Sequence, residues 1–326
     1  MKIIKTVLIV IVALVLVAIV GLIILFVYIN HHNENYYKYA VTGGEIEEKY
    51  SALGPYDVSY IDFDAGNDIY KKYEIWYPTD MMNSDQTYPL VVMANGTGVK
   101  ASQYKEVFQH LSSWGFIVIG NEDENSRTGA SSAASLDFAL SLNTDSNSIF
   151  YSKIDIENIG IAGHSQGGVG AVNAVTNQKN GIQYKVLFTA SMTSPYWGQD
   201  DVFGKEWSYD FSKVNIPCFM VAGTGKADAG TGTAIDITAK EGQGICPLWG
   251  LLDNYSSIPD SVSKIMARQV GKDHGDMLRS ADGYMTAWFM WHLKDDNTAQ
   301  AAFIGENAEI INNSNWQDIK TNLSNN

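Results

Sequence analysis

The chain has 326 residues, of which 45% are hydrophobic and 18% charged, and its formal net charge is −14. This composition is too apolar for a disordered chain, and two cysteines are too few for a disulfide-rich scaffold. A protein this acidic repels phosphate backbones, which argues against nucleic acid as a partner. Once an N-terminal apolar segment is set aside, about 290 residues remain, enough for one large α/β domain or two small ones.

Residues 1–30 are the apolar segment. No charged residue occurs from position 6 to position 29, and almost every side chain there is aliphatic or aromatic. As a helix, this run spans roughly 35 Å, enough to cross a bilayer core. The alternative is a cleaved signal peptide, but its apolar core is usually shorter, and no A-x-A pattern follows the run. We therefore predict a transmembrane signal-anchor embedded in the lipid bilayer.

The charges that flank this segment favour one orientation. Lys2 and Lys5 precede the run, and Lys38 is the only lysine or arginine from His31 to Tyr39, just after it. The positive-inside rule then places the N-terminus in the cytoplasm and the rest of the chain outside it. Residues 31–50 are polar and rich in tyrosine, which suits a short stalk, and residues 51–326 remain for a folded domain.

The two cysteines leave an alternative open. Outside the cytoplasm, Cys218 and Cys246 could form a disulfide bond. Cys218 also opens an apolar, strand-like run, where a buried free thiol is equally ordinary.

Short β-rich runs alternate with amphipathic helical stretches through the domain. Strands are expected at 90–94, 116–120, 159–162, 185–189, 218–222 and 264–270, and helices at 102–114, 135–142, 166–178 and 284–293. Residues 60–77 alternate like an antiparallel edge hairpin, and the Gly- and Thr-rich stretch 223–244 is a long loop. This alternation predicts an α/β fold with a mostly parallel central sheet and helices on both faces.

One motif carries the chemistry. The five residues from Gly163 to Gly167 match G-x-S-x-G, and they stand between a predicted strand and a predicted helix. That context is typical of a nucleophile elbow, in which the serine occupies a strained turn at the carboxyl edge of the sheet. One alternative is a Gly-rich turn between a strand and a helix with an incidental serine. The other is a dinucleotide-binding turn, which is disfavoured because G-x-G-x-x-G is absent. We predict Ser165 as the nucleophile.

A serine nucleophile needs a histidine base, which follows it in the chain order of this motif. His274 lies in a polar loop after a predicted strand and before a helix, and we predict it as the base. The other histidines lie in the stalk, precede or adjoin the serine, or lie on the last helix; they are His31, His32, His110, His164 and His292.

The carboxylate that orients the base is expected between the serine and the histidine. Asp228 follows the strand at 218–222 and is our candidate. Three further aspartates are alternatives, namely Asp236, Asp253 and Asp273.

Two backbone N–H groups should bind the oxyanion that forms during acyl transfer. One belongs to Gln166, directly after the nucleophile, and the other to Thr97, in the loop after the strand at 90–94. Asn95 begins a glycosylation sequon in that loop, but a glycan there would block the pocket. No cysteine pair has zinc-ligand spacing and no P-loop pattern is met, so neither a metal nor another cofactor is predicted.

With these motifs, the chain resembles the α/β-hydrolase superfamily, and within it the dienelactone-hydrolase-like and cutinase-like polyester hydrolases. The resemblance runs from residues 54–56 and 75–78 through the elbow to residues 284–294. It implies an open cleft without a cap domain, with Thr97 as an oxyanion donor and Tyr196 and Trp197 as an aromatic wall for the acyl group. The alternative for Trp197 is a place in the core, packed under the loop 198–212. The chain departs from the family pattern in an acid loop one residue longer and in an extended insert at 229–260.

Together these features predict a membrane-anchored, extracytoplasmic serine hydrolase that cleaves small or polymeric carboxylic esters. A peptidase or an acyltransferase with the same triad is one alternative. A catalytically silent cell-surface binding module on a hydrolase scaffold is the other.

Overall fold

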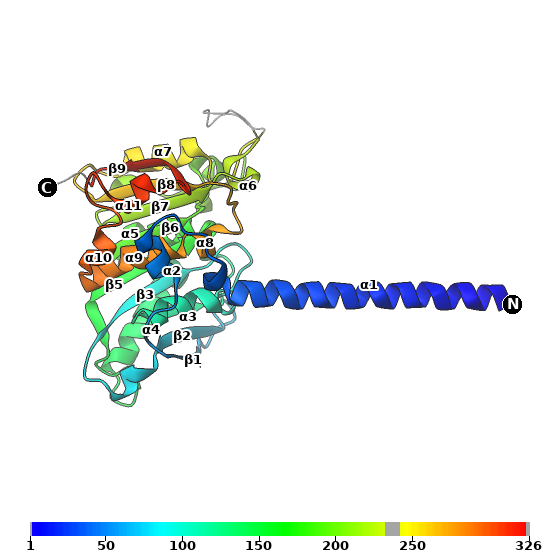
Figure 1. The fold of residues 1–326 in the computed structure, drawn as a ribbon. Coiled ribbons are helices and arrows are strands. Elements are labelled where there is room, and N and C mark those ends of the chain that lie inside the picture. The colour runs from blue at the N-terminus through cyan, green and yellow to red at the C-terminus, as the bar shows by residue number, and fades with distance from the viewer. Residues whose placement is uncertain (1, 232–241, 324–326) are drawn as a thin grey trace. The chain divides into compact units, whose positions relative to one another are not determined.

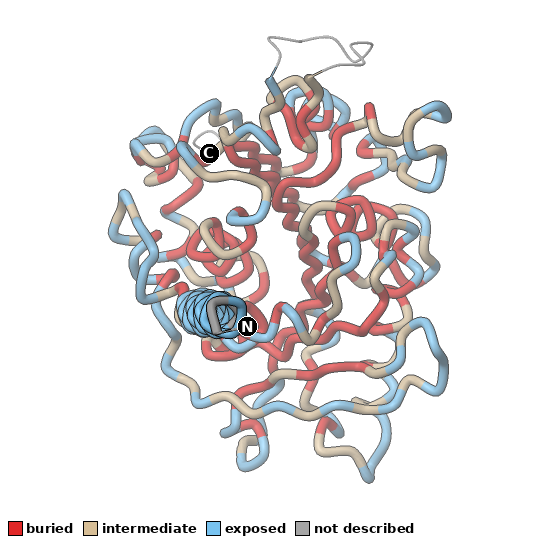
Figure 2. Tube along the Cα trace, turned by 90° about the vertical axis from the view of Figure 1, so that its right-hand side faces the viewer, coloured by how far each residue is buried: buried red, intermediate tan, exposed pale blue. Residues whose placement is uncertain are grey.

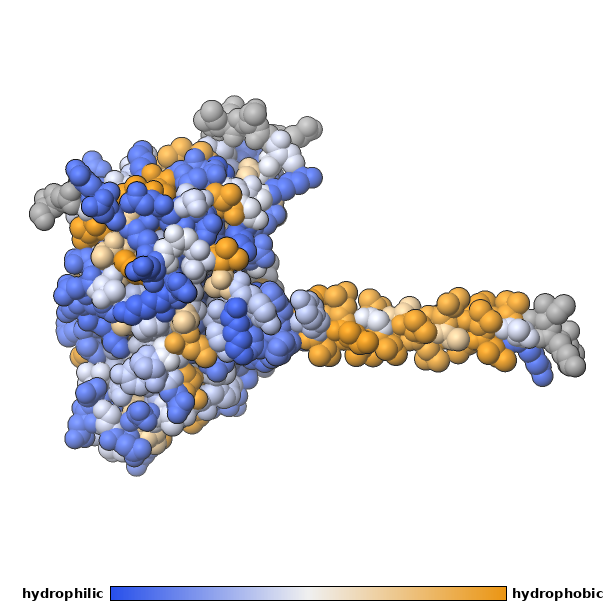
Figure 3. All heavy atoms as spheres, in the orientation of Figure 1, coloured by the Kyte–Doolittle hydropathy of each residue, from blue (hydrophilic) through white to orange (hydrophobic). Residues whose placement is uncertain are grey.

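The computed structural model describes residues 2–231 and 242–323, and the chain divides into two compact units, Met1–Tyr39 and Ala40–Asn326 (Figure 1). The first unit consists of helix α1 (Lys2–Glu34) and a short 3₁₀ turn, Tyr36–Tyr39. Within α1, the stretch Ile4–Glu34 is long and apolar enough to cross a membrane, with a window of mean hydropathy 3.7. Apolar residues cover almost all of the α1 face drawn in Figure 3.

The helix continues four residues beyond the predicted end of the anchor at residue 30. No glycine or proline occurs between Asn30 and Glu34, so nothing in the local sequence stops the helix there. In the second half of the predicted stalk, residues 45–51 form helix α2 (Glu45–Ser51), and Tyr50 is fully buried. The packed domain therefore begins earlier than residue 51, because α2 packs on a helix near the C-terminus, α9 (Asp282–Lys294).

The second unit is built on a nine-stranded sheet in the order β1-β2-β4-β3-β5-β6-β7-β8-β9. The strands from β4 to β8 pair in parallel, and the pairs at both edges are antiparallel. Their bounds are β1 (Val58–Asp64), β2 (Lys72–Pro78), β3 (Tyr88–Ala94), β4 (Ile117–Asn121), β5 (Ile154–His164), β6 (Tyr184–Ala190), β7 (Cys218–Gly223), β8 (Lys264–Gln269) and β9 (Trp316–Thr321). This is the mostly parallel sheet of an α/β hydrolase, as predicted.

Helices cover both faces of the sheet. One face packs against α4, α5 and α7, and the other against α3 and α9. The remaining helices are short. The helix bounds are α3 (Lys105–Ser113), α4 (Ala130–Thr144), α5 (Gln166–Asn177), α6 (Lys226–Ala229), α7 (Leu248–Ser257), α8 (Met277–Ser280), α10 (Asn297–Gln300) and α11 (Glu309–Asn312).

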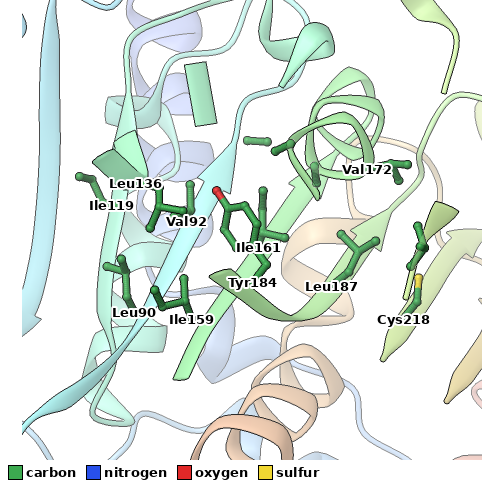
Figure 4. Close-up of a cluster of buried hydrophobic side chains, with 14 of the residues drawn as sticks. Leu90, Val92, Ile119, Leu136, Ile159, Ile161, Val172, Tyr184, Leu187 and Cys218 are labelled. Atoms are coloured by element: carbon green, nitrogen blue, oxygen red, sulfur yellow. The ribbon is translucent and has the colours of Figure 1, made fainter. Parts of the chain in front are cut away.

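Aliphatic side chains of the central strands form the core under α4 and α5. Figure 4 shows Leu90, Val92, Ile159 and Ile161 of neighbouring strands side by side, with Leu136 of α4 close to them. All five are fully buried. Buried chain runs through the central strands, and exposed chain concentrates in the peripheral loops (Figure 2). Because β3 to β8 are parallel, their carboxyl ends meet at one edge of the sheet, the edge where ligands bind in open α/β folds.

The segment predicted as a long loop, 223–244, holds the short helix α6, and residues 232–241 lie outside the described residues. After it, α7 packs on the sheet, so this part of the insert contributes to the core. Cys218 and Cys246 are buried free thiols, and burial raises the pKa of both. The structure therefore contains no disulfide bond between them.

Candidate active site

Ser165 occupies the tight turn between β5 and α5. Its backbone has φ 58° and ψ −125°, a conformation that is strained for a residue with a Cβ. Two glycines allow the chain to turn here. A Cβ at Gly163 would lie 2.0 Å from the carbonyl oxygen of Gly167, and a Cβ at Gly167 would lie 2.1 Å from that of Ala94. The turn thus has the strand–turn–helix geometry expected from the motif.

His274 lies in the loop between β8 and α8, with 18% of its side chain exposed. Its Nε2 is 3.0 Å from Ser165 Oγ, and its Nδ1 is 2.8 Å from Asp228 Oδ1. Because an ionised carboxylate can only accept hydrogen bonds, Nδ1 carries the proton in this arrangement and Nε2 is left to accept from the serine hydroxyl. The structure therefore brings the predicted nucleophile, base and acid together in one hydrogen-bonded chain.

Asp228 is fully buried in α6. Besides the bond to the imidazole, its Oδ2 accepts hydrogen bonds from Ser191 Oγ at 2.5 Å and from the Gly223 N–H at 2.7 Å. These bonds compensate for the burial of a charged group. Sequence reasoning missed Ser191, which follows β6 and has a positive φ of 47°, because no motif marks it.

The three alternative acids have other surroundings. Asp253 is exposed on α7. Asp273 adjoins the base in sequence, but its carboxylate accepts hydrogen bonds from backbone N–H groups. Asp236 lies outside the described residues. Among the described aspartates, Asp228 is the one whose carboxylate bonds to His274 Nδ1.

The loop after β3 runs beside the elbow, since a Cβ on Gly96 would lie 3.3 Å from the carbonyl oxygen of His164. The amides on both sides of Thr97 are already paired, that of Gly96 with Tyr104 Oη and that of Gly98 with a carbonyl oxygen. Thr97 is exposed, and its N–H donates to no acceptor within the described residues. Gln166 is the first residue of α5, where the helix offers its N–H no acceptor. Neither of the two predicted oxyanion donors is thus paired within the described residues.

Asn95 holds this loop in place. Its side-chain amide is buried and donates to the carbonyl oxygens of Asn121 at 2.6 Å and Asp123 at 2.8 Å, in the segment that ends β4. Both amide hydrogens are therefore used inside the protein. Asn95 therefore has a structural role in the loop, and its side chain is not accessible.

His164 is a second residue that the sequence analysis passed over, although it lies within the motif. Its Nε2 is 2.8 Å from the carbonyl oxygen of His274, and since a carbonyl only accepts, Nε2 donates. Burial, followed by the proximity of His274, lowers the pKa of His164 to about 4. His164 is therefore a neutral donor at pH 7, and it ties the base loop to the elbow.

The predicted aromatic wall lies in the 3₁₀ turn after β6, Pro195–Gly198. Tyr196 is buried, whereas Trp197 is partly exposed and its Nε1 donates to the carbonyl oxygen of Gly244 at 3.2 Å. The Trp197 ring stacks on Phe203 with centroids 5.0 Å apart, and Phe203 is 54% exposed. Trp197 and Phe203 therefore present more surface to a ligand than Tyr196.

Across residues 2–231 and 242–323, no group of three or more His, Cys, Asp or Glu side chains could hold a metal ion. No curated protein matches the chain. A family model described as PETase, PET hydrolase-like, matches residues 45–234. Because this match spans more than half of the chain and includes the elbow, the protein belongs to the PET hydrolase-like family, a group of carboxylic ester hydrolases with the α/β-hydrolase fold.

Proposed function

We propose that the protein hydrolyses carboxylic esters through a Ser165–His274–Asp228 triad. The observation that carries the proposal is the unbroken chain of hydrogen bonds, 3.0 Å from Ser165 Oγ to His274 Nε2 and 2.8 Å from His274 Nδ1 to Asp228. A nucleophile, a base and an orienting acid in this arrangement are the parts that acyl transfer needs.

In the first half of the reaction, Ser165 Oγ attacks the acyl carbon and its proton passes to His274 Nε2. The N–H groups of Thr97 and Gln166 stabilise the negative charge on the former carbonyl oxygen. When the bond to the alcohol breaks, His274 returns the proton to the leaving oxygen, and the acyl group stays on Ser165. Asp228 holds the imidazole in the required tautomer and stabilises the imidazolium.

In the second half, water attacks the acyl-enzyme. His274 takes a proton from the water and then gives it to Ser165 Oγ as the carboxylic acid leaves. The balance is one ester and one water consumed, and one acid and one alcohol produced.

We propose Tyr196 and Trp197 as the wall that receives the acyl side of the ester, with Trp197 supplying most of the contact. The ring of Trp197 stacks on the exposed Phe203, so an apolar or aromatic group could pack against this pair. The family is described by its action on PET, an aromatic polyester, and this supports an aromatic or polymeric ester as the substrate class.

We propose that α1 anchors the catalytic domain, which lies in the unit Ala40–Asn326, in a membrane with that domain outside the cytoplasm. The length and hydropathy of Ile4–Glu34 support the anchor. Lys2 and Lys5 before the apolar run, against Lys38 alone from His31 to Tyr39, support the orientation.

Turnover of short-chain p-nitrophenyl esters tests the proposal. Ser165→Ala removes the attacking oxygen and should lower kcat by on the order of 10⁴-fold, with the circular dichroism spectrum unchanged. A variant that kept near-normal turnover would show that Ser165 is not the nucleophile.

A further inference from the structure

Asp273, the residue directly before His274, joins the loops that carry the acid and the base. Its Oδ1 accepts hydrogen bonds from the N–H of His274 at 2.8 Å and from the N–H of Asp228 at 2.9 Å. Its Oδ2 accepts from the N–H of Ala227 at 3.1 Å. One carboxylate therefore contacts the backbone of both residues whose side chains form the acid–base pair.

The contact also completes the short helix α6. The residue before this helix is Gly225, which has no side chain to cap it, so the first N–H groups of the helix lack an internal partner. Asp273 supplies that cap from the neighbouring loop. A Cβ at Gly225 would lie 2.4 Å from Asp273 Cγ, so glycine is required for the two loops to approach this closely.

Two further hydrogen bonds, both from backbone N–H groups, join the loop before α6 to the loop that carries His274. The N–H of Gly225 donates to the carbonyl oxygen of Lys272 at 2.8 Å, and the N–H of Gly271 donates to Thr224 Oγ1 at 2.8 Å. Burial alone would raise the pKa of Asp273, but the N–H donors of Ala227, Asp228 and His274 lower it below its usual value. The carboxylate is therefore ionised at pH 7 and acts as an acceptor for all three donors.

We propose that Asp273 is a positioning residue that sets the distance and direction between the Asp228 carboxylate and the His274 imidazole. This rests on the proposed function, in which that pair serves catalysis. Because Asp273 bonds to the backbone N–H groups of both residues, it fixes one backbone relative to the other. A shift between the two backbones would change the hydrogen bond from His274 Nδ1 to Asp228 Oδ1. Misplacement of a catalytic group by about 1 Å can cost on the order of 10²-fold in rate.

Asp273→Asn tests the proposal, because it keeps the shape of the side chain but turns one acceptor into a donor that faces a backbone N–H. We expect kcat to fall about 10- to 100-fold with KM within about twofold of wild type. Asp253→Asn is the matched control, since it removes one negative charge from an exposed side chain on the neighbouring helix α7. All assays are run well below the melting temperature of each protein, so that the measured kcat is that of folded protein.

A double-mutant cycle distinguishes positioning from general stability. In the Asp228→Asn background the acid–base pair is already broken, so adding Asp273→Asn should change kcat by less than about twofold. An equal fold-loss in both backgrounds, or a kcat within twofold of wild type for the single variant, would overturn the proposal. If Asp273→Asn does not fold, Asp273→Ser replaces it in the same cycle, since its shorter side chain cannot bridge all three donors.

The Ser165→Ala variant separates this inference from the proposed function. If Ser165→Ala keeps its turnover, the triad itself is wrong. If Ser165→Ala is inactive while Asp273→Asn keeps wild-type kcat, only the positioning role fails.

Discussion

The side chain of Trp197 is held by contacts within the protein and is also partly exposed to solvent. Its indole N–H is tied to the carbonyl oxygen of Gly244, and one side of its ring is stacked on Phe203, yet the residue stays partly exposed. A ring held in this way loses little conformational entropy when it contacts a ligand. This supports a role in holding the acyl group of a bulky ester.

Replacing Trp197 with alanine should raise KM for bulky aromatic esters several-fold, equivalent to about 1 kcal/mol, and change KM for acetate esters little. Trp197→Phe is the matched variant, because it keeps an aromatic ring and loses the bond to Gly244 and the second ring of the indole. Steady-state kinetics with both ester classes make the measurement. Equal losses for every ester, together with a large fall in melting temperature, would assign Trp197 to the core.

The residues of the site differ in how far sequence can reveal them. Ser165 is recognisable because its motif is local, and the strain at the turn dictates the flanking glycines. His274 follows from chain order. Ser191 and the bridging role of Asp273 arise from contacts between residues 37 and 45 positions apart, which no local pattern encodes. The sequence therefore predicts the residues that a local motif or the chain order marks, and misses those whose roles come from contacts between distant residues.

At the scale of elements, His110 of α3 joins two further helices. Its Nδ1 lies 2.7 Å from Asp282 Oδ2 of α9, and its Nε2 lies 2.9 Å from the carbonyl oxygen of Ala52, just after α2. Both partners are acceptors, so both ring nitrogens carry protons. Burial alone would lower the pKa of His110, but the Asp282 carboxylate raises it above its ordinary value. His110 and Asp282 thus form a buried ion pair.

His110→Gln should destabilise the domain by roughly 3 kcal/mol, because the buried Asp282 loses its counter-charge. Since the pKa of His110 is higher in the folded state, its stabilisation is full below about pH 6.5 and declines as pH rises through the folded pKa. Urea denaturation at about pH 6 and about pH 9 should therefore show a larger difference between wild type and variant at the lower pH.

The control replaces both partners, as His110→Leu with Asp282→Leu, and should be closer to wild type than His110→Gln is. A difference between wild type and His110→Gln that stays constant with pH, or grows as pH rises, would contradict a charged His110.

Element prediction succeeded where hydrophobic runs are long or alternation is regular, as for β3, the β1–β2 hairpin and α5. It missed β9 because this edge strand is mostly polar, and its place is set by antiparallel pairing with β8. It also missed α2, whose helix is stabilised by packing on α9 and by burial of Tyr50 beside the Trp114 ring rather than by its own length.

At the scale of the whole molecule, the chain combines an acidic catalytic unit with one long apolar helix. The unit Ala40–Asn326 contains all the residues of the proposed site and has its own core. The apolar helix lies wholly in the other unit, Met1–Tyr39. Folding and catalysis should therefore not depend on the apolar helix.

A protein that begins at Ala40 should be soluble without detergent and hydrolyse esters with the kcat of the full chain. The full-length protein should stay in the membrane fraction through a high-salt wash, because its helix is held by hydrophobic burial rather than by charge. Fractionation followed by ester assays makes the comparison. A secreted native form that begins near residue 30 would instead show that the segment is a cleaved signal peptide.

The central claim is that Ser165 is a nucleophile activated by His274, and a fluorophosphonate probe tests it most directly. Attack by Ser165 Oγ on phosphorus would form an O–P bond and expel fluoride, leaving a stable adduct. Peptide mapping by mass spectrometry should locate one label per chain on Ser165, with none at this position in Ser165→Ala and much slower labelling in His274→Ala. A label on another residue, or none on folded and catalytically active protein, would contradict the account.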